Sequence, residues 1–280
     1  MSIIRSNLFQ SVFERVPFPL VLKTVEIHGR AIFDAIEWEN TINVKNTVFS
    51  IRLKRKRVLQ HNWGYAIYLK DLKTIDQFLE KQFKSKKRSI IRRYINRLEK
   101  CLTIRYKIYW GDIEELTYEL LMATLQKMIS KRFDEKGEHH QEMKRWDELK
   151  QRTFSQIKKK QASLFVIYDD GLPIEISLNY HLGEVLFSSI SSYDMDYSKF
   201  GLGHVEIYKQ LEWCLQNGYH TFEMGVGGMD YKARWSNYIY QFEHVVLHQD
   251  TTLTSRLFGN YEYHRIRLKE YLKSKKINEL

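Results

Sequence analysis

The sequence predicts an α/β (α+β) fold in which helices flank a mixed β-sheet. One observation is that residues 162–191 contain three strand-like runs joined by short turns, and that Asp169-Asp170-Gly171 suits a tight hairpin. A second is that residues 184–224 follow the order strand, glycine-containing loop, amphipathic helix and strand. Hairpins followed by such a β-loop-α-β unit favour a mixed sheet.

The elements before the hairpins are predicted from periodicity. Helical spacing predicts helices over Asn7–Val16, over a segment capped by Asp71, and over residues 84–100. A long helix is predicted from Asp112 to Arg132, and another over residues 142–158. The apolar set expected on the long helix is Leu116, Leu120, Ala123, Leu125 and Met128. Alternation predicts strands at 20–27, 47–53, 65–69 and 102–109.

After the hairpins, a helix is predicted over residues 204–217, and Gly218 is its C-terminal stop. Its expected packing face is Ile207, Tyr208, Leu211, Cys214 and Leu215. Strands follow at 219–224 and 242–248, and a basic helix begins at about Thr254.

Composition bounds the class of protein. The chain has 280 residues, 43% hydrophobic and 28% charged, as expected of a globular protein with one large or two ordinary domains. No stretch approaches the roughly 18 apolar residues of a membrane span, and the N-terminus lacks the apolar core of a signal peptide. Two distant cysteines, Cys101 and Cys214, build no disulfide framework. We therefore expect a cytoplasmic protein. We expect no metal, because His139 and His140 lack a third ligand at useful spacing.

The positive charge is local. The net charge is +11, and residues 84–107 carry ten basic residues against one acid, Glu99. The expected outer face of the helix at 84–100 displays four arginines, namely Arg88, Arg92, Arg93 and Arg97. Such a face attracts phosphates, an anionic carrier or an anionic membrane. The alternative is an ordinary solvated surface.

A glycine pair marks a candidate ligand site. Gly201 and Gly203 stand just before the first turn of the helix predicted at 204–217. This leaves backbone N–H groups free at the positive end of a helix, with no side chain blocking a ligand, and a pyrophosphate fits there. Many loops contain Gly-x-Gly, so the pair alone is weak evidence.

The order of motifs from Phe83 to Trp235 resembles the acetyltransferase domain of CelD-like and FemAB-like proteins, a branch of the GNAT superfamily. A basic helix, KSKKRSIIRRYINRLEK, comes first, the loop YSKFGLG leads into a helix, and MGVGGMDYKARW ends the region with a Tyr-Lys pair. The resemblance implies a GNAT-type fold that transfers an acyl group from a thioester to an amine or hydroxyl. The co-substrate would be acetyl-coenzyme A or a longer acyl-coenzyme A, bound by residues Phe200, Gly201, Leu202, Gly203 and His204.

The sequence departs from the common GNAT pattern at Ser198, where many members carry Gln or Arg three residues before the first glycine. This leaves an acyl-carrier protein or an aminoacyl-tRNA open as the donor. The resemblance also implies two tandem GNAT-like halves. Residues 1–105, with the basic helix, would form a degenerate first half, and residues 106–280 would form the acyltransferase half.

Four residues are candidates for catalysis. Glu175 precedes the loop and could act as base, directly or through a water, or it could be an outward-facing strand carboxylate. Asp194 could orient the acceptor amine or merely cap a turn. Tyr231 and Lys232 match the Tyr-Lys pair of the family and could serve as acid and carbonyl contact, or be surface residues.

The candidate acceptor site consists of Arg132, Tyr193 and Asp196. The resemblance implies Arg132, and the other two lie at the strand end beside the glycine loop.

The first hypothesis for function is an N-acyltransferase with a small-molecule or lipid-precursor acceptor. The second is a FemAB-type transferase that uses aminoacyl-tRNA, and the third is a non-catalytic GNAT-like or nucleic-acid-binding protein.

Overall fold

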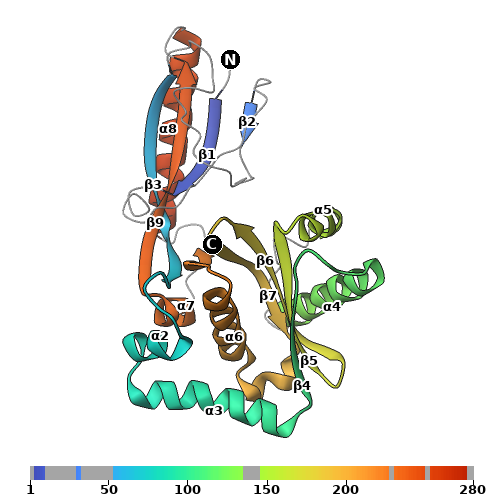
Figure 1. The fold of residues 1–280 in the computed structure, drawn as a ribbon. Coiled ribbons are helices and arrows are strands. Elements are labelled where there is room, and N and C mark those ends of the chain that lie inside the picture. The colour runs from blue at the N-terminus through green and yellow to red at the C-terminus, as the bar shows by residue number, and fades with distance from the viewer. Residues whose placement is uncertain are drawn as a thin grey trace. The chain divides into compact units, whose positions relative to one another are not determined.

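A computed structural model describes residues 3–9, 30–32, 53–134, 146–226, 230–249 and 253–275 (Figure 1). The elements in chain order are β1 (Ile3–Phe9), β2 (Arg30–Ile32), β3 (Leu53–Tyr68), α2 (Ile75–Gln82), α3 (Ser85–Cys101), β4 (Ile104–Tyr109), α4 (Glu115–Asp134), α5 (Trp146–Lys158), β5 (Ala162–Asp169), β6 (Leu172–Leu182), β7 (Val185–Tyr193), the 3₁₀ helix η2 (Met195–Phe200), α6 (Leu202–Gln216), β8 (Thr221–Val226), α7 (Asp230–Trp235), β9 (Tyr238–Gln249) and α8 (Leu253–Ser274).

The chain divides into two compact units, and the first consists of residues Met1–Tyr65 and Val226–Leu280. Its strands follow the order β2-β1-β9-β3, and β1 pairs parallel with β2 and antiparallel with β9. Helix α8 packs against β9 and β1. Val58, Val246 and Ile266 form a small buried cluster in this unit.

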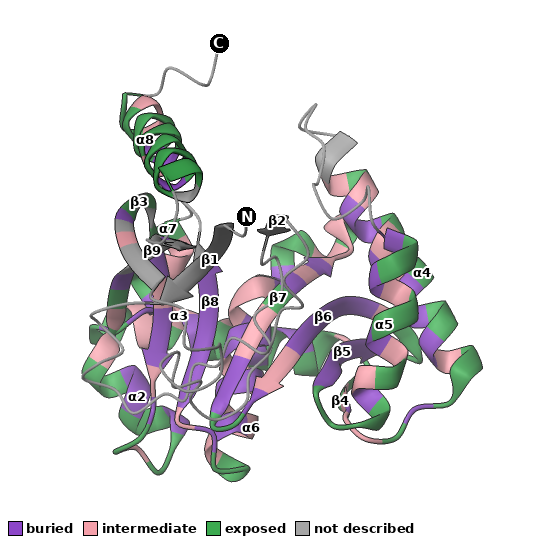
Figure 2. Ribbon diagram, turned by 90° about the horizontal axis from the view of Figure 1, so that it is seen from above, coloured by how far each residue is buried: buried purple, intermediate pink, exposed green. Residues whose placement is uncertain are grey.

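The second unit, Ala66–Gly225, holds a sheet of order β8-β7-β6-β5-β4. β7 and β8 run parallel, and the pairs β4–β5, β5–β6 and β6–β7 are antiparallel. The predicted α/β fold with a mixed, helix-flanked sheet is therefore confirmed. The central strands are largely buried (Figure 2), because α6 packs on one face while α4 and α5 cover the other.

The predicted hairpin turn is present between β5 and β6. Asp170 and Gly171 both have positive φ, 44° and 84°, as a type I′ turn requires. Helix α6 likewise ends where predicted, because Gly218 adopts a φ of +75° just after the helix.

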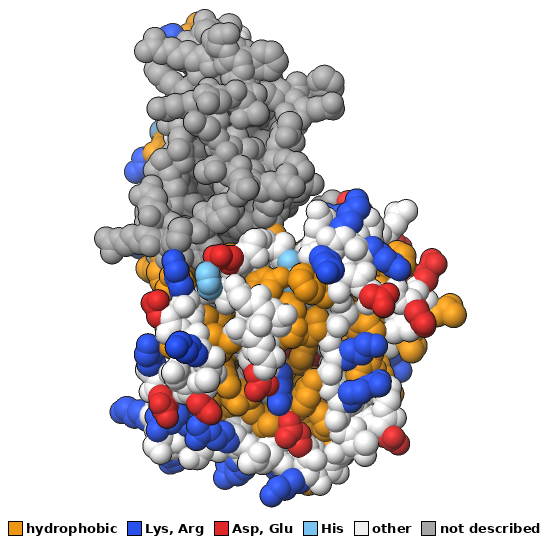
Figure 3. Space-filling view, viewed as in Figure 1, with side chains coloured by type: hydrophobic (Ala, Val, Ile, Leu, Met, Phe, Trp, Pro, Cys, Tyr) orange, Lys and Arg blue, Asp and Glu red, His pale blue; other side chains and the backbone are white. Residues whose placement is uncertain are grey.

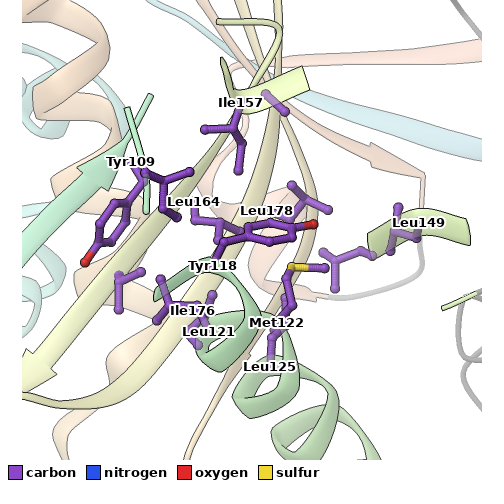
Figure 4. Packing of buried hydrophobic residues seen from close by; sticks show 14 of the residues in the cluster. Tyr109, Tyr118, Leu121, Met122, Leu125, Leu149, Ile157, Leu164, Ile176 and Leu178 are labelled. Carbon is purple, nitrogen blue, oxygen red and sulfur yellow. The ribbon is translucent and has the colours of Figure 1, made fainter. Parts of the chain in front are cut away.

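Strand β6 sorts its side chains by alternation. Ile176 and Leu178 join the core formed with α4 and α5, in which Tyr118, Leu121, Met122 and Leu125 pack over the sheet (Figure 4). The side chains between them, Glu175 and Ser177, therefore belong to the opposite face, which lies under α6.

Some predicted elements differ from the structure. Asn7–Phe9, predicted as helix, belongs to strand β1, because it pairs in register with β9. The cap of α2 is Thr74 and not Asp71, since the Thr74 hydroxyl accepts from the Gln77 N–H at 3.3 Å. Predictions for residues 10–29, 33–52 and 135–145, including His139 and His140, lie outside the described residues. The division near residue 105 stays a prediction.

The buried face of α4 also differs from the predicted set. Leu116 and Leu120 are 84% and 61% exposed, and Ala123 is exposed too. Leu125 and Met128 are buried as predicted, and Tyr118, Leu121, Met122 and Ile129 complete the buried face. Apolar residues lie nearly all round this helix, so periodicity alone allows either face. Contact with α5, where Tyr118 meets Phe154 at 5.0 Å between ring centroids, selects the observed one.

This rotation of α4 has a measurable consequence. Leu125→Ala should lower the free energy of unfolding by about 2–5 kcal/mol, because it opens a cavity in the core. Leu116→Ala should change it by less than about 0.5 kcal/mol, because that side chain is in water. Denaturant unfolding of both variants measures the difference, and equal losses would contradict the assigned face.

Candidate functional site: the start of α6 and a buried pair of carboxyls

Helix α6 begins at a glycine in the left-handed region. Gly201 is the N-cap of α6 and has φ 65° and ψ 40°. A Cβ at this position would lie 2.9 Å from the Tyr94 ring of α3. Both the backbone conformation and the close approach of α3 therefore require glycine at 201.

The first turn of α6 is open to a ligand. Helix α6 starts at Leu202, two residues before the predicted start, so Gly203 lies in the helix and not in the preceding loop. Within the described residues, the N–H groups of Leu202 and Gly203 donate to no backbone carbonyl, and no side chain caps the helix. A Cβ at Gly203 would meet nothing within 4 Å. Free donors at a positive helix end, with space above them, suit an anionic group.

The basic helix α3 lies against this turn. Tyr94 stacks on His204 with 5.7 Å between ring centroids, and Lys87 Nζ lies 3.4 Å from His204 Nε2. The guanidinium of Arg97 lies over the Phe200 ring at 5.5 Å. Figure 3 shows Lys and Arg side chains gathered along the lower edge of this unit, where α3 lies. The structure thus brings the predicted ligand residues 200–204 together with two cations of α3.

The four arginines predicted to form a docking face have different surroundings. Arg88 donates to the Phe83 carbonyl at 2.9 Å, and Arg92 forms an ion pair with Asp76 at 2.7 Å. Arg97 contacts Phe200, whereas no ion pair is recorded for Arg93 among the described residues. Part of the charge run therefore stabilises contacts within the unit.

Under α6, two glutamates meet at one serine. Glu175 of β6 is fully buried, and Glu206 of α6 is 6% exposed. The Ser177 Oγ lies 2.6 Å from Glu175 Oε1 and 2.8 Å from Glu206 Oε1. The amide of Gln210 donates to the same Glu206 oxygen at 2.8 Å. Glu175 is therefore not an outward-facing carboxylate, which was the structural alternative for it.

The geometry requires a proton on this pair. Ser177 has one hydroxyl hydrogen and can donate to only one carboxyl, so the other carboxyl must donate to Ser177. Burial raises the pKa of Glu175 well above its ordinary value, and the charge of Glu206 adds to this increase. Burial raises the pKa of Glu206 to about 7. Hydrogen bonds from Ser177, Ser191 and Gln210 and the charge of Arg132 act in the opposite direction and lower this pKa.

One oxygen of this pair is still available to a further group. Glu175 Oε2 is buried and has no hydrogen-bond partner among the residues that the structure describes. A buried carboxyl with a pKa raised in this way can exchange protons near neutral pH.

The other predicted site residues fall into two places. Arg132 lies over the Tyr193 ring at 5.8 Å, and Asp194 caps η2 by accepting from the Asp196 N–H at 3.2 Å. The Lys131 Nζ lies 3.8 Å from Asp194 and 3.5 Å from Asp196. Arg132, Tyr193, Asp194 and Asp196 thus lie around one strand end.

Tyr231 and Lys232 are in α7, in the other unit. Their roles, like those of the other predicted residues, stay predictions.

Sequence reasoning missed Ser177, Glu206 and Gln210. The only available signal was a Glu and a Gln four residues apart on the face of α6 that carries its buried apolar residues.

The described helices include none that is long and apolar enough to cross a membrane. Nor do the described residues contain a group of three or more His, Cys, Asp or Glu able to hold a metal.

The family comparison places the chain among acyltransferase-type α/β proteins. Residues 85–233 match the family described as "Acetyltransferase (GNAT) domain". This is more than half of the 280 residues, so the chain belongs to the GNAT acetyltransferase family, as its motifs predicted. No match to a curated protein was found.

Solved structures show more distant likeness. FemX aligns at 10% identity over 66% of this chain and 62% of its own, with a TM-score of 0.49. L-PGS from Bacillus licheniformis aligns at 11% over 81% and 68%, also at 0.49. A conserved protein of unknown function from Bacteroides thetaiotaomicron VPI-5482 aligns at 10% over 73% and 65%, again at 0.49. The chain spans less than two thirds of the first and third of these proteins, and the FemAB-like and CelD-like branch stays a prediction.

The proton held by the carboxyl pair should make stability depend on pH. A carboxyl whose pKa is raised by folding stabilises fully below its ordinary value, here 4.5, and this stabilisation is lost as pH rises through about 7. In the wild type, the free energy of unfolding should therefore fall between those pH values, by about 1.4 kcal/mol for each unit by which the pKa is shifted. Glu206→Gln should make this fall smaller. Urea titrations across this range measure it. Glu212→Gln, on the same helix, should keep the wild-type slope, and an unchanged slope in Glu206→Gln would refute the shared proton.

The two glycines should respond oppositely to alanine. Gly201→Ala should destabilise by about 1–2 kcal/mol or more, because it is forced into the left-handed region against Tyr94. Gly203→Ala should be neutral or stabilise by up to about 1 kcal/mol, because it lies in a helix with free space around it. Thermal unfolding of both variants decides, and a large loss at 203 would mean that this space is filled by the protein itself.

Proposed function

We propose that the protein is an N-acyltransferase that moves an acyl group from an acyl thioester to an amine acceptor. The donor is acyl-coenzyme A, acetyl or longer, or an acyl-carrier protein. The observation that carries the proposal is the open first turn of α6, where the N–H groups of Leu202 and Gly203 donate to no backbone carbonyl of the described residues. Membership of the GNAT family supports the reaction class.

The first turn of α6 fits the phosphate part of the donor. Oxygens of a pyrophosphate or phosphopantetheine would accept from the two free N–H groups, and Lys87 and Arg97 add positive charge nearby. Gly203 lets the ligand approach the backbone, because no side chain stands above it. Arg132, Tyr193 and Asp196 would line the acceptor side.

The buried carboxyls supply the proton transfer. The amine nitrogen forms a bond to the thioester carbonyl carbon, the carbon–sulfur bond breaks, and one proton must pass from nitrogen to the leaving thiolate. Glu175 accepts that proton through a water at its unpartnered Oε2, while its own proton passes from Oε1 to the Ser177 Oγ and the Ser177 hydroxyl proton passes to the ionised Glu206. Tyr231 and Lys232 remain candidates for protonating the thiolate and contacting the carbonyl, and Asp194 for orienting the amine.

The test is thermal stability with coenzyme A, acetyl-coenzyme A and a long-chain acyl-coenzyme A. A ligand at about 100 times its dissociation constant adds about 2.7 kcal/mol, which raises the melting temperature by a few degrees. Gly203→Val should abolish the shift and keep the melting temperature of the free protein, because its side chain enters the ligand space.

The outcomes separate the donor classes. A shift that survives in Gly203→Val would move the donor away from α6. If no coenzyme A ligand shifts the melting temperature, coenzyme A thioesters are excluded as donors, and an acyl-carrier protein or a charged tRNA is left. Arg93→Glu would then weaken binding of these larger anions, with a steep dependence on salt.

A further inference from the structure

Helix α8 displays a continuous apolar stripe to solvent. Leu257, Leu268, Tyr261 and Tyr271 are 59%, 57%, 63% and 57% exposed, and Leu253 at the start of the helix is 71% exposed. With the exposed His264 they recur at intervals of three or four residues, so they share one face along the whole helix. Figure 2 shows most of α8 as exposed. From Leu253 to Tyr271, the stripe runs for roughly 27 Å along the helix axis.

The opposite face of α8 already holds the helix to its own unit. Ile266 packs with Val58 and Val246, and Glu270 accepts from the His61 N–H at 2.8 Å. The exposed stripe is therefore not needed to anchor the helix. An isolated exposed leucine needs no explanation, whereas an aligned set of leucines and tyrosines marks an interaction surface.

The charges beside the stripe indicate what it meets. Glu262 and Glu270, the acids of α8, are buried and paired within the helix, with Arg265 at 2.8 Å and Lys273 at 2.8 Å. The described part of α8 thus exposes no carboxylate. The exposed ionic side chains flanking the stripe are Arg256, Arg265, Arg267 and Lys269.

A second copy of the chain would be a poor partner for this stripe. The spacing of three and four residues also suits a coiled coil, but Arg265 and Arg267 would then flank the seam. Two such helices would bring arginines together with no exposed acid to pair them.

We propose that α8 lies on an anionic lipid surface, with its leucines and tyrosines in the headgroup region and with Arg267 and Lys269 on lipid phosphates. A helix that lies in the plane of a membrane interface requires an apolar face with aromatic residues and basic residues on its flanks. The long basic side chains reach the phosphates while their stems cover apolar surface. The inference does not depend on the proposed reaction.

The test is flotation of the full chain with vesicles of phosphatidylcholine alone and of phosphatidylcholine mixed with phosphatidylglycerol. The wild type should float with the mixed vesicles and stay in solution with the neutral ones. Leu257→Glu with Leu268→Glu should weaken partitioning by about tenfold or more, because two carboxylates enter the stripe. The matched control is Leu116→Glu with Leu120→Glu on α4, which changes two leucines that are at least as exposed and should float as the wild type does.

Three results would overturn the proposal. The first is that the wild type stays in solution with both kinds of vesicle, and the second is that it floats equally with both. The third is that the α8 variant floats as well as the wild type. A dimer in sedimentation velocity that the α8 variant converts to monomer would assign the stripe to a second copy. Circular dichroism of each variant shows whether it is folded.

Discussion

The Ser177 hydroxyl between two buried carboxyls is the constraint on which the second unit depends. Glu175 and Glu206 are too deeply buried and too close together for both to be ionised, so one proton stays with the pair. The contact joins the polar face of β6 to the inner face of α6. Glu206 follows Gly203 by three residues, roughly 4.5 Å along the helix axis. The groups that hold α6 on the sheet therefore also set where its open first turn lies.

The sequence predicted the parts of this arrangement that local patterns encode. Asp170-Gly171 predicted the hairpin because these residue types accept positive φ. Helical spacing over residues 84–100 predicted α3, which spans Ser85–Cys101. The strand-like run after the Asp170-Gly171 turn predicted strand β6, which the structure shows to have one apolar and one polar face. It could not show that a helix covers the polar face, because Ser177, Glu206 and Gln210 find one another only in the tertiary structure.

The wrong predictions have the same origin in long-range contacts. α4 carries apolar residues around most of its circumference, so only packing against α5 and the sheet selects Leu121 and Leu125 over Leu116 and Leu120. Asp71 and Thr74 are both good caps by residue type, and Thr74 caps α2 because the helix begins at Ile75. The docking role of the basic run of α3 stays a prediction, and the structure adds that Arg92 in this run pairs with Asp76.

The first turn of α6 and the carboxyl pair are electrostatically linked because one helix carries both. An anion at the N–H groups of Leu202 and Gly203 opposes ionisation of Glu206 one turn below, and so favours the protonated pair. By reciprocity, ionisation of the pair weakens binding of the anion by the same free energy. The cations of α3 reduce this repulsion, and Lys87 stands beside His204 at the helix end itself. If the first turn of α6 binds a phosphate as proposed, the buried pair would therefore retain its proton more readily near neutral pH, an effect that the helix dipole alone does not provide.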